Sequence, residues 1–192
     1  ITYAGATAGV TVKSNGGSGA DTINLEGFDS LHASDLTVTG DTNDNVTFQS
    51  NDTVMGVYDL TVTAQTITVD STVSTTDGEI SLTASRNILL NNGSSLTTVD
   101  GGITLLANNG GTTAGNFKGT FIDHASLETA GTGNISVTGY GGAGTGDSNL
   151  GIDTSYAAFS STGTGANAGT ITIDGTGGAN GGAFERGLYL QY

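Results

Sequence analysis

Residues 60–107 read LTVTAQTITVDSTVSTTDGEISLTASRNILLNNGSSLTTVDGGITLLA. Short triplets such as LTV, ITV, ISL and ILL recur in this stretch, and turns rich in Asp, Asn, Gly, Ser and Thr separate them. Successive side chains of a β-strand point to opposite faces. Alternation of apolar and polar residues with a period of two therefore predicts half-buried strands.

The triplets return in a fixed order, so the chain passes through three kinds of strand and then begins again. In chain order within a coil, the strands begin at Ile67 and Ile88 for the first kind, at Val73 and Leu96 for the second, and at Leu60, Ile80 and Ile103 for the third. A chain that repeats the same strands every 20 to 23 residues is typical of a solenoid. The sequence therefore predicts an all-β fold, a parallel β-helix (β-solenoid) of about six coils.

The chain is expected to form a single β-solenoid domain over residues 1–192, with two sizes of coil. Residues 1–107 form tight coils of about 20–24 residues, and residues 108–192 form longer coils of about 32–36 residues. Residues 135–154 align without a gap to residues 171–190, which identifies an internal repeat. The added residues form Gly-rich loops between the third strand type and the first, at 108–119, 139–150 and 175–186. One edge of the solenoid is therefore expected to carry large loops.

The composition excludes several classes of protein. The chain contains no Cys, which rules out a disulfide scaffold and a thiolate zinc site. Its net charge of −14 disfavours nucleic acid, whose phosphates need a basic surface. No run of about 18 apolar residues exists, so no membrane-spanning segment is predicted. The chain begins in mid-strand at Ile1 without a signal peptide, from which we expect a segment of a longer polypeptide.

Four units carry a resemblance to a known family: LTVTA (60–64), ISLTA (80–84), ITLLA (103–107) and ISVTG (135–139). Each is a strand that ends in a small residue. Over roughly residues 36–192 the chain resembles the haemagglutinin-type repeat region of large secreted bacterial adhesins and filament proteins. The resemblance implies a right-handed β-helix, an extracellular or cell-surface location, and a role in cell adhesion or fibre building.

One segment matches a calcium-binding repeat. GGSGADTIN at 16–24 fits the nonapeptide GGxGxDxUx, in which Gly carbonyls and an Asp carboxylate bind Ca²⁺. The partial echo GDTNDNVTF at 40–48 places Asp44 one coil beyond Asp21. Calcium at Asp21 and Asp44 is one interpretation. The alternative is an Asp/Gly corner that satisfies its own backbone, and this reading requires no cofactor.

A column of residues precedes the first strand of each coil by two positions. Its members are Asp21, Asp44, Gln65, Arg86, Lys118, Leu150 and Arg186. Arg86 and Lys118 are expected to be neighbours, and an acidic surface glycan is a candidate ligand for them, with Tyr140 as a stacking platform. The alternative is a solvated corner. Other aromatic residues gather in the same half of the chain, at Phe117, Tyr156, Phe159, Phe184 and Tyr189.

Outward positions of the third strand type form a Thr/Ser ladder, at Thr37, Thr61, Ser81, Thr104, Ser136 and Thr172. A second column runs beside it, at Thr39, Thr63, Thr83 and Thr138, and is interrupted by Leu106 and Asp174. Regular Thr arrays occur on ice-binding solenoids. The alternative is that β-branched Thr suits an exposed strand.

No catalytic constellation accompanies these features. His32 and His124 have no partner His at a metal-binding spacing. GYGGAG at 139–144 matches GxGxxG, but no helical pattern follows it. The sequence therefore predicts a structural or adhesive module rather than an enzyme. We expect its uncapped ends to stack on copies of itself or on adjoining repeats. The alternatives are a glycan- or ice-binding module and a β-helix polysaccharide-degrading enzyme.

Overall fold

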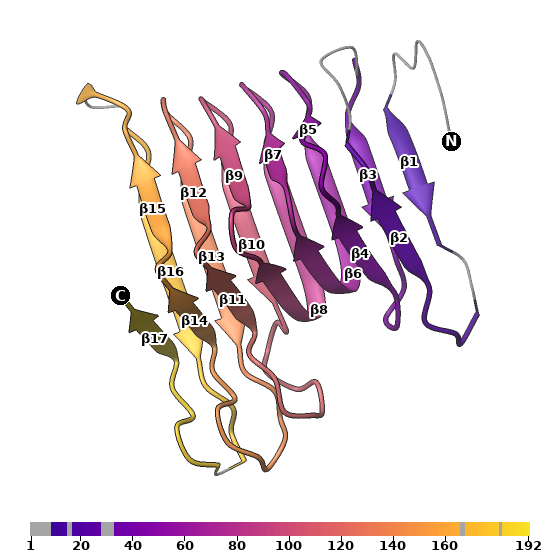
Figure 1. Ribbon diagram of the computed structural model, residues 1–192, viewed down its shortest axis with the longest axis vertical. Coiled ribbons are helices and arrows are strands. Elements are labelled where there is room, and N and C mark those ends of the chain that lie inside the picture. The colour runs from indigo at the N-terminus through magenta and orange to yellow at the C-terminus, as the bar shows by residue number, and fades with distance from the viewer. Residues whose placement is uncertain (1–8, 15–16, 28–32, 166–167, 181) are drawn as a thin grey trace.

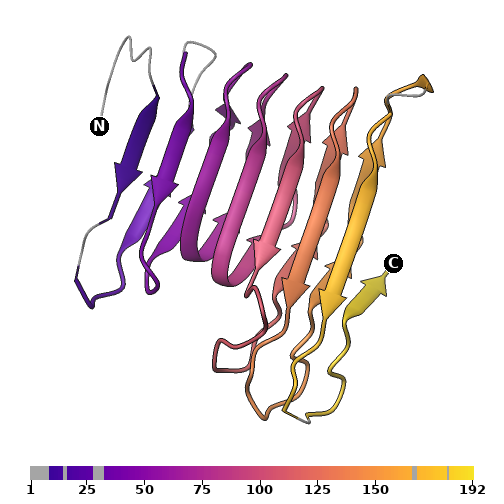
Figure 2. The same cartoon turned by 180° about the vertical axis from the view of Figure 1, so that it is seen from behind.

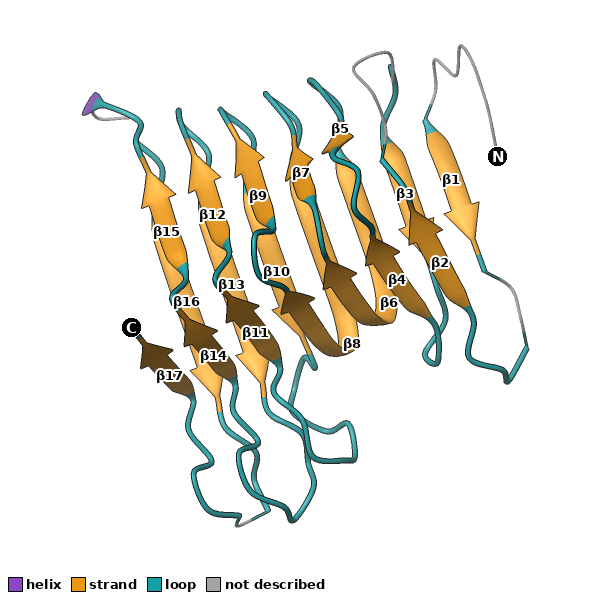
Figure 3. Cartoon of the chain, viewed as in Figure 1, coloured by secondary structure: helices purple, strands orange, loops and turns teal. Residues whose placement is uncertain are grey.

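The computed structural model describes residues 9–14, 17–27, 33–165, 168–180 and 182–192. The protein is all-β, with parallel strands in a 12-stranded and a 5-stranded sheet (Figures 1 and 3). Within these residues no α-helix forms, so the structure offers no helix suited to crossing a bilayer.

The strands are short and come at regular intervals along the chain. They are β1 (Val10–Lys13), β2 (Thr22–Leu25), β3 (Leu36–Thr39), β4 (Asn45–Phe48), β5 (Thr53–Val54), β6 (Leu60–Val69), β7 (Thr72–Ser74), β8 (Ile80–Leu90), β9 (Ser95–Thr98), β10 (Ile103–Ala107), β11 (Thr120–Asp123), β12 (Ser126–Thr129), β13 (Ile135–Tyr140), β14 (Ile152–Ser155), β15 (Ala158–Ser161), β16 (Ile171–Thr176) and β17 (Leu188–Gln191).

Pairing arranges these strands in three rows, as Figures 1 and 2 show. Row A contains β1, β3, the first half of β6, the first half of β8, β10, β13 and β16. Row B contains β2, β4, the second halves of β6 and β8, β11, β14 and β17, and row C contains β5, β7, β9, β12 and β15. Each strand pairs in parallel with the equivalent strand of a neighbouring unit. Ile103 lies opposite Ile80 on one side and Ile135 on the other, which confirms the predicted register.

The tight units differ from the prediction in one respect. Separate triplets were expected between rows A and B, whereas β6 and β8 are continuous strands of 10 and 11 residues. No Gly lies at the junction, and the register shifts between Ala64 and Thr66. Such a shift bends a strand without ending it. The small side chains of Ala64 and Ala84 are buried at the bend.

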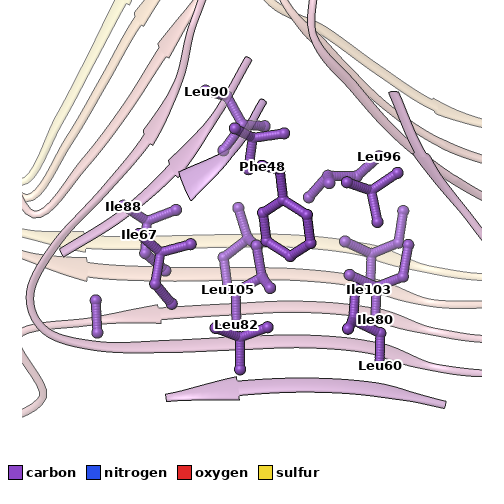
Figure 4. Close-up of a cluster of buried hydrophobic side chains, with 14 of the residues drawn as sticks. Phe48, Leu60, Ile67, Ile80, Leu82, Ile88, Leu90, Leu96, Ile103 and Leu105 are labelled. Carbon is purple, nitrogen blue, oxygen red and sulfur yellow. The ribbon is translucent and has the colours of Figure 1, made fainter. Parts of the chain in front are cut away.

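The core consists of the inward side chains of all three rows (Figure 4). Leu60, Ile80 and Ile103 of row A are fully buried, as are Ile67 and Ile88 of row B. Outward neighbours alternate with them, and the burial pattern of β3 is buried, intermediate, buried, intermediate. Burial of each such aliphatic side chain stabilises the fold by about 1.5–3 kcal/mol.

A column of glycines forms the corner between rows C and A. A Cβ on Gly101 would lie 1.9 Å from the carbonyl oxygen of Gly78, and one on Gly133 would lie 2.0 Å from that of Gly101. The hydroxyl of Thr98 donates to the carbonyl of its own corner at Gly101, at 2.5 Å. Thr75 does the same at Gly78. Backbone therefore packs directly on backbone here, and the T-x-D-G tetrapeptides at 75–78 and 98–101 encode the corner.

The long loops lie where the sequence predicts them, between rows A and B (Figure 2). They cover 108–119, 141–151 and 177–187, because β13 and β16 extend slightly into the predicted loops. A Cβ on Gly139 would lie 2.3 Å from the carbonyl oxygen of Gly151. The two arms of the loop therefore meet at a neck with no room for side chains, which explains the local abundance of Gly.

Candidate functional site

Three of the four basic residues of the chain lie in one column beside row B. Row B pairing places Ile88, Thr120, Ile152 and Leu188 side by side in successive units. Arg86, Lys118 and Arg186 each lie two positions before one of these residues, so the predicted column is confirmed for the basic residues. In a chain with net charge −14, this column concentrates nearly all of the positive charge.

Each of these cations lies over an aromatic ring. Cζ of Arg86 is 4.9 Å from the centroid of Phe117, and Nζ of Lys118 is 4.0 Å from that of Phe121. Cζ of Arg186 is 5.1 Å from the centroid of Tyr189 and 5.8 Å from that of Phe184. The ring's negative face attracts the cation and holds its side chain in place.

Phe121 and Tyr189 are positions of the site that sequence reasoning missed in this role. Each follows its cation by three residues and lies in row B. Asp153 lies between them in the register, opposite both Phe121 and Tyr189. The recurring interval of three residues between cation and ring is the signal that could have identified them.

Arg86 and Lys118, which were predicted to act together, contact different residues. Nζ of Lys118 lies 2.5 Å from Oδ2 of Asp153, whose side chain is only 8% exposed. Arg86 covers Phe117, which is itself buried. Tyr140 lies beside Gly111, where a Cβ would be 3.6 Å from its ring. The glycan contact predicted at Arg86, Lys118 and Tyr140 therefore stays a prediction. Within the protein, Lys118 already pairs with Asp153, and Arg86 already lies over Phe117.

Two buried asparagines hold the long loops together. Nδ2 of Asn108 donates to the carbonyl of Gly141 at 2.9 Å, and Nδ2 of Asn149 donates to that of Gly146 at 2.7 Å. Oδ1 of Asn149 accepts the main-chain N–H of Phe117 at 3.0 Å. The bonds from Asn108 to Gly141 and from Phe117 to Asn149 link loops of successive units, whereas the bond from Asn149 to Gly146 lies within one loop.

The Asp21 and Asp44 corner is occupied by hydrogen bonds from the backbone. Oδ1 of Asp44 accepts the N–H of Asp21 at 2.9 Å, and Oδ2 accepts the N–H of Asp41 at 2.9 Å. The N–H of Asp41, with a smaller effect from that of Asp21, lowers the pKa of the buried Asp44 carboxyl. Oδ2 of Asp21 accepts the hydroxyl of Ser14.

These contacts favour the structural interpretation of the corner. Among the described residues no cluster of three or more His, Cys, Asp or Glu side chains is arranged to hold a metal ion. Gly16 of the nonapeptide lies outside the described residues. Calcium binding at Asp21 and Asp44 therefore stays a prediction.

The Thr/Ser ladder has the predicted register. Thr61 lies opposite Thr37 and Ser81, and Thr104 lies opposite Ser81 and Ser136. Ice binding by this array stays a prediction. Elsewhere, Nδ1 of His124 lies 2.7 Å from Oδ1 of Asp123, and its ring stacks on Tyr156. His32 lies outside the described residues.

Comparison of this chain with protein-family models, with curated proteins and with solved structures found no match.

Proposed function

We propose that this chain is a right-handed parallel β-helix of about six coils that serves as a structural and adhesive module of an exported bacterial surface protein or extracellular fibre. In this proposal the modules stack end to end and perform no catalysis. The parallel pairing of equivalent strands in three rows supports the coiled arrangement. The location outside the cell rests on the resemblance of the row A units to haemagglutinin-type repeats.

The observation that supports end-to-end stacking is the apolar edge formed by the last unit. Ile171 and Leu188 are 41% and 38% exposed, although their partners Ile135 and Ile152 in the preceding unit are buried. Leu190 is 51% exposed. β15, β16 and β17 each pair on one side only within the described residues, which leaves main-chain donors and acceptors free at this edge (Figure 1).

Such an edge favours the addition of another parallel strand. An adjoining repeat of a longer polypeptide or a second copy of this chain can supply both strands and inward aliphatic side chains, because units of this kind share the same register. Addition of one copy to the next gives a head-to-tail contact, which generates a filament when it does not close.

Sedimentation velocity across a concentration series tests this proposal. The unmodified protein is expected to form larger species as its concentration rises, and electron microscopy is expected to show filaments. Leu190→Lys places a charge on the edge and is expected to reduce association. Val57→Lys, at a position 54% exposed in a turn, is the matched control and should leave association unchanged. A protein that remains monomeric throughout the series would refute end-to-end stacking of separate copies.

A further inference from the structure

A hollow of about 200 Å³ lies beside the last basic residue of the column. It is lined by Ser148, Leu150, Phe184, Arg186 and Tyr189. We propose that this hollow binds a carboxylated sugar residue of an acidic polysaccharide. The proposal deepens the adhesive role proposed above and rests on it, since it names the chemical class of ligand to which the module adheres.

Arg186 supplies the charge recognition. Its guanidinium is fixed by the rings of Tyr189 and Phe184. The ion pairs formed among the described residues are Lys118–Asp153 and His124–Asp123, and neither involves Arg186. A planar guanidinium forms two parallel hydrogen bonds with a carboxylate, which gives both strength and orientation. In the part of the chain that the structure describes, Arg86 and Arg186 thus have no internal carboxylate to displace, and Arg186 is the one of the two that lines the hollow.

Phe184 and Ser148 have backbone conformations that residues other than Gly rarely adopt. Phe184 has φ of 63° and Ser148 has φ of 64°, in loops where Gly is abundant. Gly would adopt these angles without strain. Phe184 nevertheless presents a ring that is 66% exposed at the rim of the hollow. Strained residues that persist in this way concentrate at ligand sites.

The rest of the hollow suits a sugar ring. Buried Leu150 and the aromatic residues Phe184 and Tyr189 provide apolar surface, and Ser148 is a polar residue of the lining. A pyranose has an apolar C–H face that covers an aromatic ring and a set of hydroxyls that stay hydrated. A few polar groups in an otherwise apolar hollow are typical of small-ligand sites.

The charge of the whole chain narrows the ligand class. Nucleic acid and other densely charged polyphosphates need several basic contacts, whereas this hollow offers one arginine in a chain of net charge −14. Salt screens charges beyond about 8 Å, so Arg186 acts locally on a single anionic group. A single carboxylated sugar residue brings one anionic group into the hollow, which matches one arginine.

Isothermal titration with oligogalacturonate tests the inference, with its methyl ester as the uncharged control ligand. The protein is expected to bind the acid and to bind the ester at least about 10-fold more weakly, as expected for loss of a charge-assisted pair. Arg186→Gln should weaken binding of the acid by a similar factor, and Phe184→Ala should weaken binding of both ligands. Lys13→Gln, in β1 far along the chain, should change neither.

Equal binding of acid and ester, unchanged binding by Arg186→Gln, or no binding by the unmodified protein would each overturn the inference. Phe184 and Arg186 are both exposed, and circular dichroism of the variants verifies that they remain folded. Sedimentation of the same samples reports self-association independently of the sugar. Failure of the ligand assay is therefore distinguishable from failure of end-to-end stacking.

Discussion

Nζ of Lys118 lies 2.5 Å from Oδ2 of Asp153, and this ion pair joins the loop before β11 to the outer face of β14. The other carboxylate oxygen of Asp153 is buried without a hydrogen-bond partner in the described part of the chain. The lysine therefore compensates a carboxylate that water reaches poorly.

Replacement of this lysine is expected to destabilise the fold. Lys118→Met leaves the carboxylate of Asp153 buried and unpaired, which we expect to lower the free energy of unfolding by about 2 kcal/mol. Urea denaturation measures the change. The double variant Lys118→Met with Asp153→Asn should recover part of the loss, and Lys13→Met should have little effect. A loss no greater than that of Lys13→Met would show that the pair contributes nothing to stability.

The corner glycines give a second prediction with adjacent test and control positions. A Cβ on Gly101 would lie 1.9 Å from a backbone oxygen, whereas one on Gly102 would meet its nearest neighbour at 3.5 Å. Gly101→Ala is therefore expected to cost about 2 kcal/mol or more, because backbone must move to accept the methyl group. Gly102→Ala should change stability by no more than about 0.5 kcal/mol. Equal thermal midpoints for the two variants would contradict the backbone-on-backbone corner.

Inward and outward positions of row A should respond differently to charge. Ile80 is fully buried, and Ile80→Asp is expected to prevent folding or assembly because it places an unpaired carboxylate in the core. Thr83 faces outward between Thr63 and Leu106 of the adjacent strands, so Thr83→Asp should be tolerated. Soluble yield and circular dichroism compare the two. A similar loss of soluble, folded protein in both variants would show that the inward and outward faces of row A are wrongly assigned.

The carboxyl of Asp44 should make folding sensitive to acid. Backbone N–H groups of Asp41 and Asp21 lower its pKa below the ordinary value of 3.8 in the folded protein. The folded state thus binds the proton less readily than the unfolded state. The stabilisation by Asp44 is complete above the unfolded-state pKa and is lost as the pH falls through the lower, folded-state pKa.

Asp44→Asn tests this linkage. Urea midpoints measured between about pH 5 and pH 2 should fall less steeply in this variant than in the unmodified protein, since the titrating group is gone. Thr42→Asn, at an exposed position of the same corner, removes no titratable group and serves as the control, so it should keep the original slope. If Asp44→Asn retains the full slope, other carboxyls cause the acid sensitivity.

Much of the strand arrangement could be predicted from sequence because its period is carried by inward residues. Leu60, Ile80 and Ile103 mark equivalent positions, and the structure pairs them directly. The continuity of β6 was not predictable from the same signal, because alternation does not distinguish a turn from a bend at a small residue such as Ala64. The predicted separation into triplets was wrong there for that reason.

The candidate site was predicted less completely. The column containing Arg86, Lys118 and Arg186 follows from the register, so its positions could be derived from spacing. The partner of Lys118 could not, because Asp153 comes from the next unit and meets it only after a long loop. The conformation of that loop depends on Gly contacts and on Asn149, which carry no periodic signal.

The loop neck at Gly139 and Gly151 has a consequence for how such a protein can diversify. Residues 141–151 leave the stack of strands and return to it at a single narrow point. On either side of this loop the register is kept, since Ile135 pairs with Ile103 and Ile152 pairs with Thr120. Insertions, deletions and substitutions beyond this point alter the exposed surface and leave the scaffold's pairing untouched. Evolution of a new binding specificity can therefore change these loops while the strand pairing that supports them stays the same.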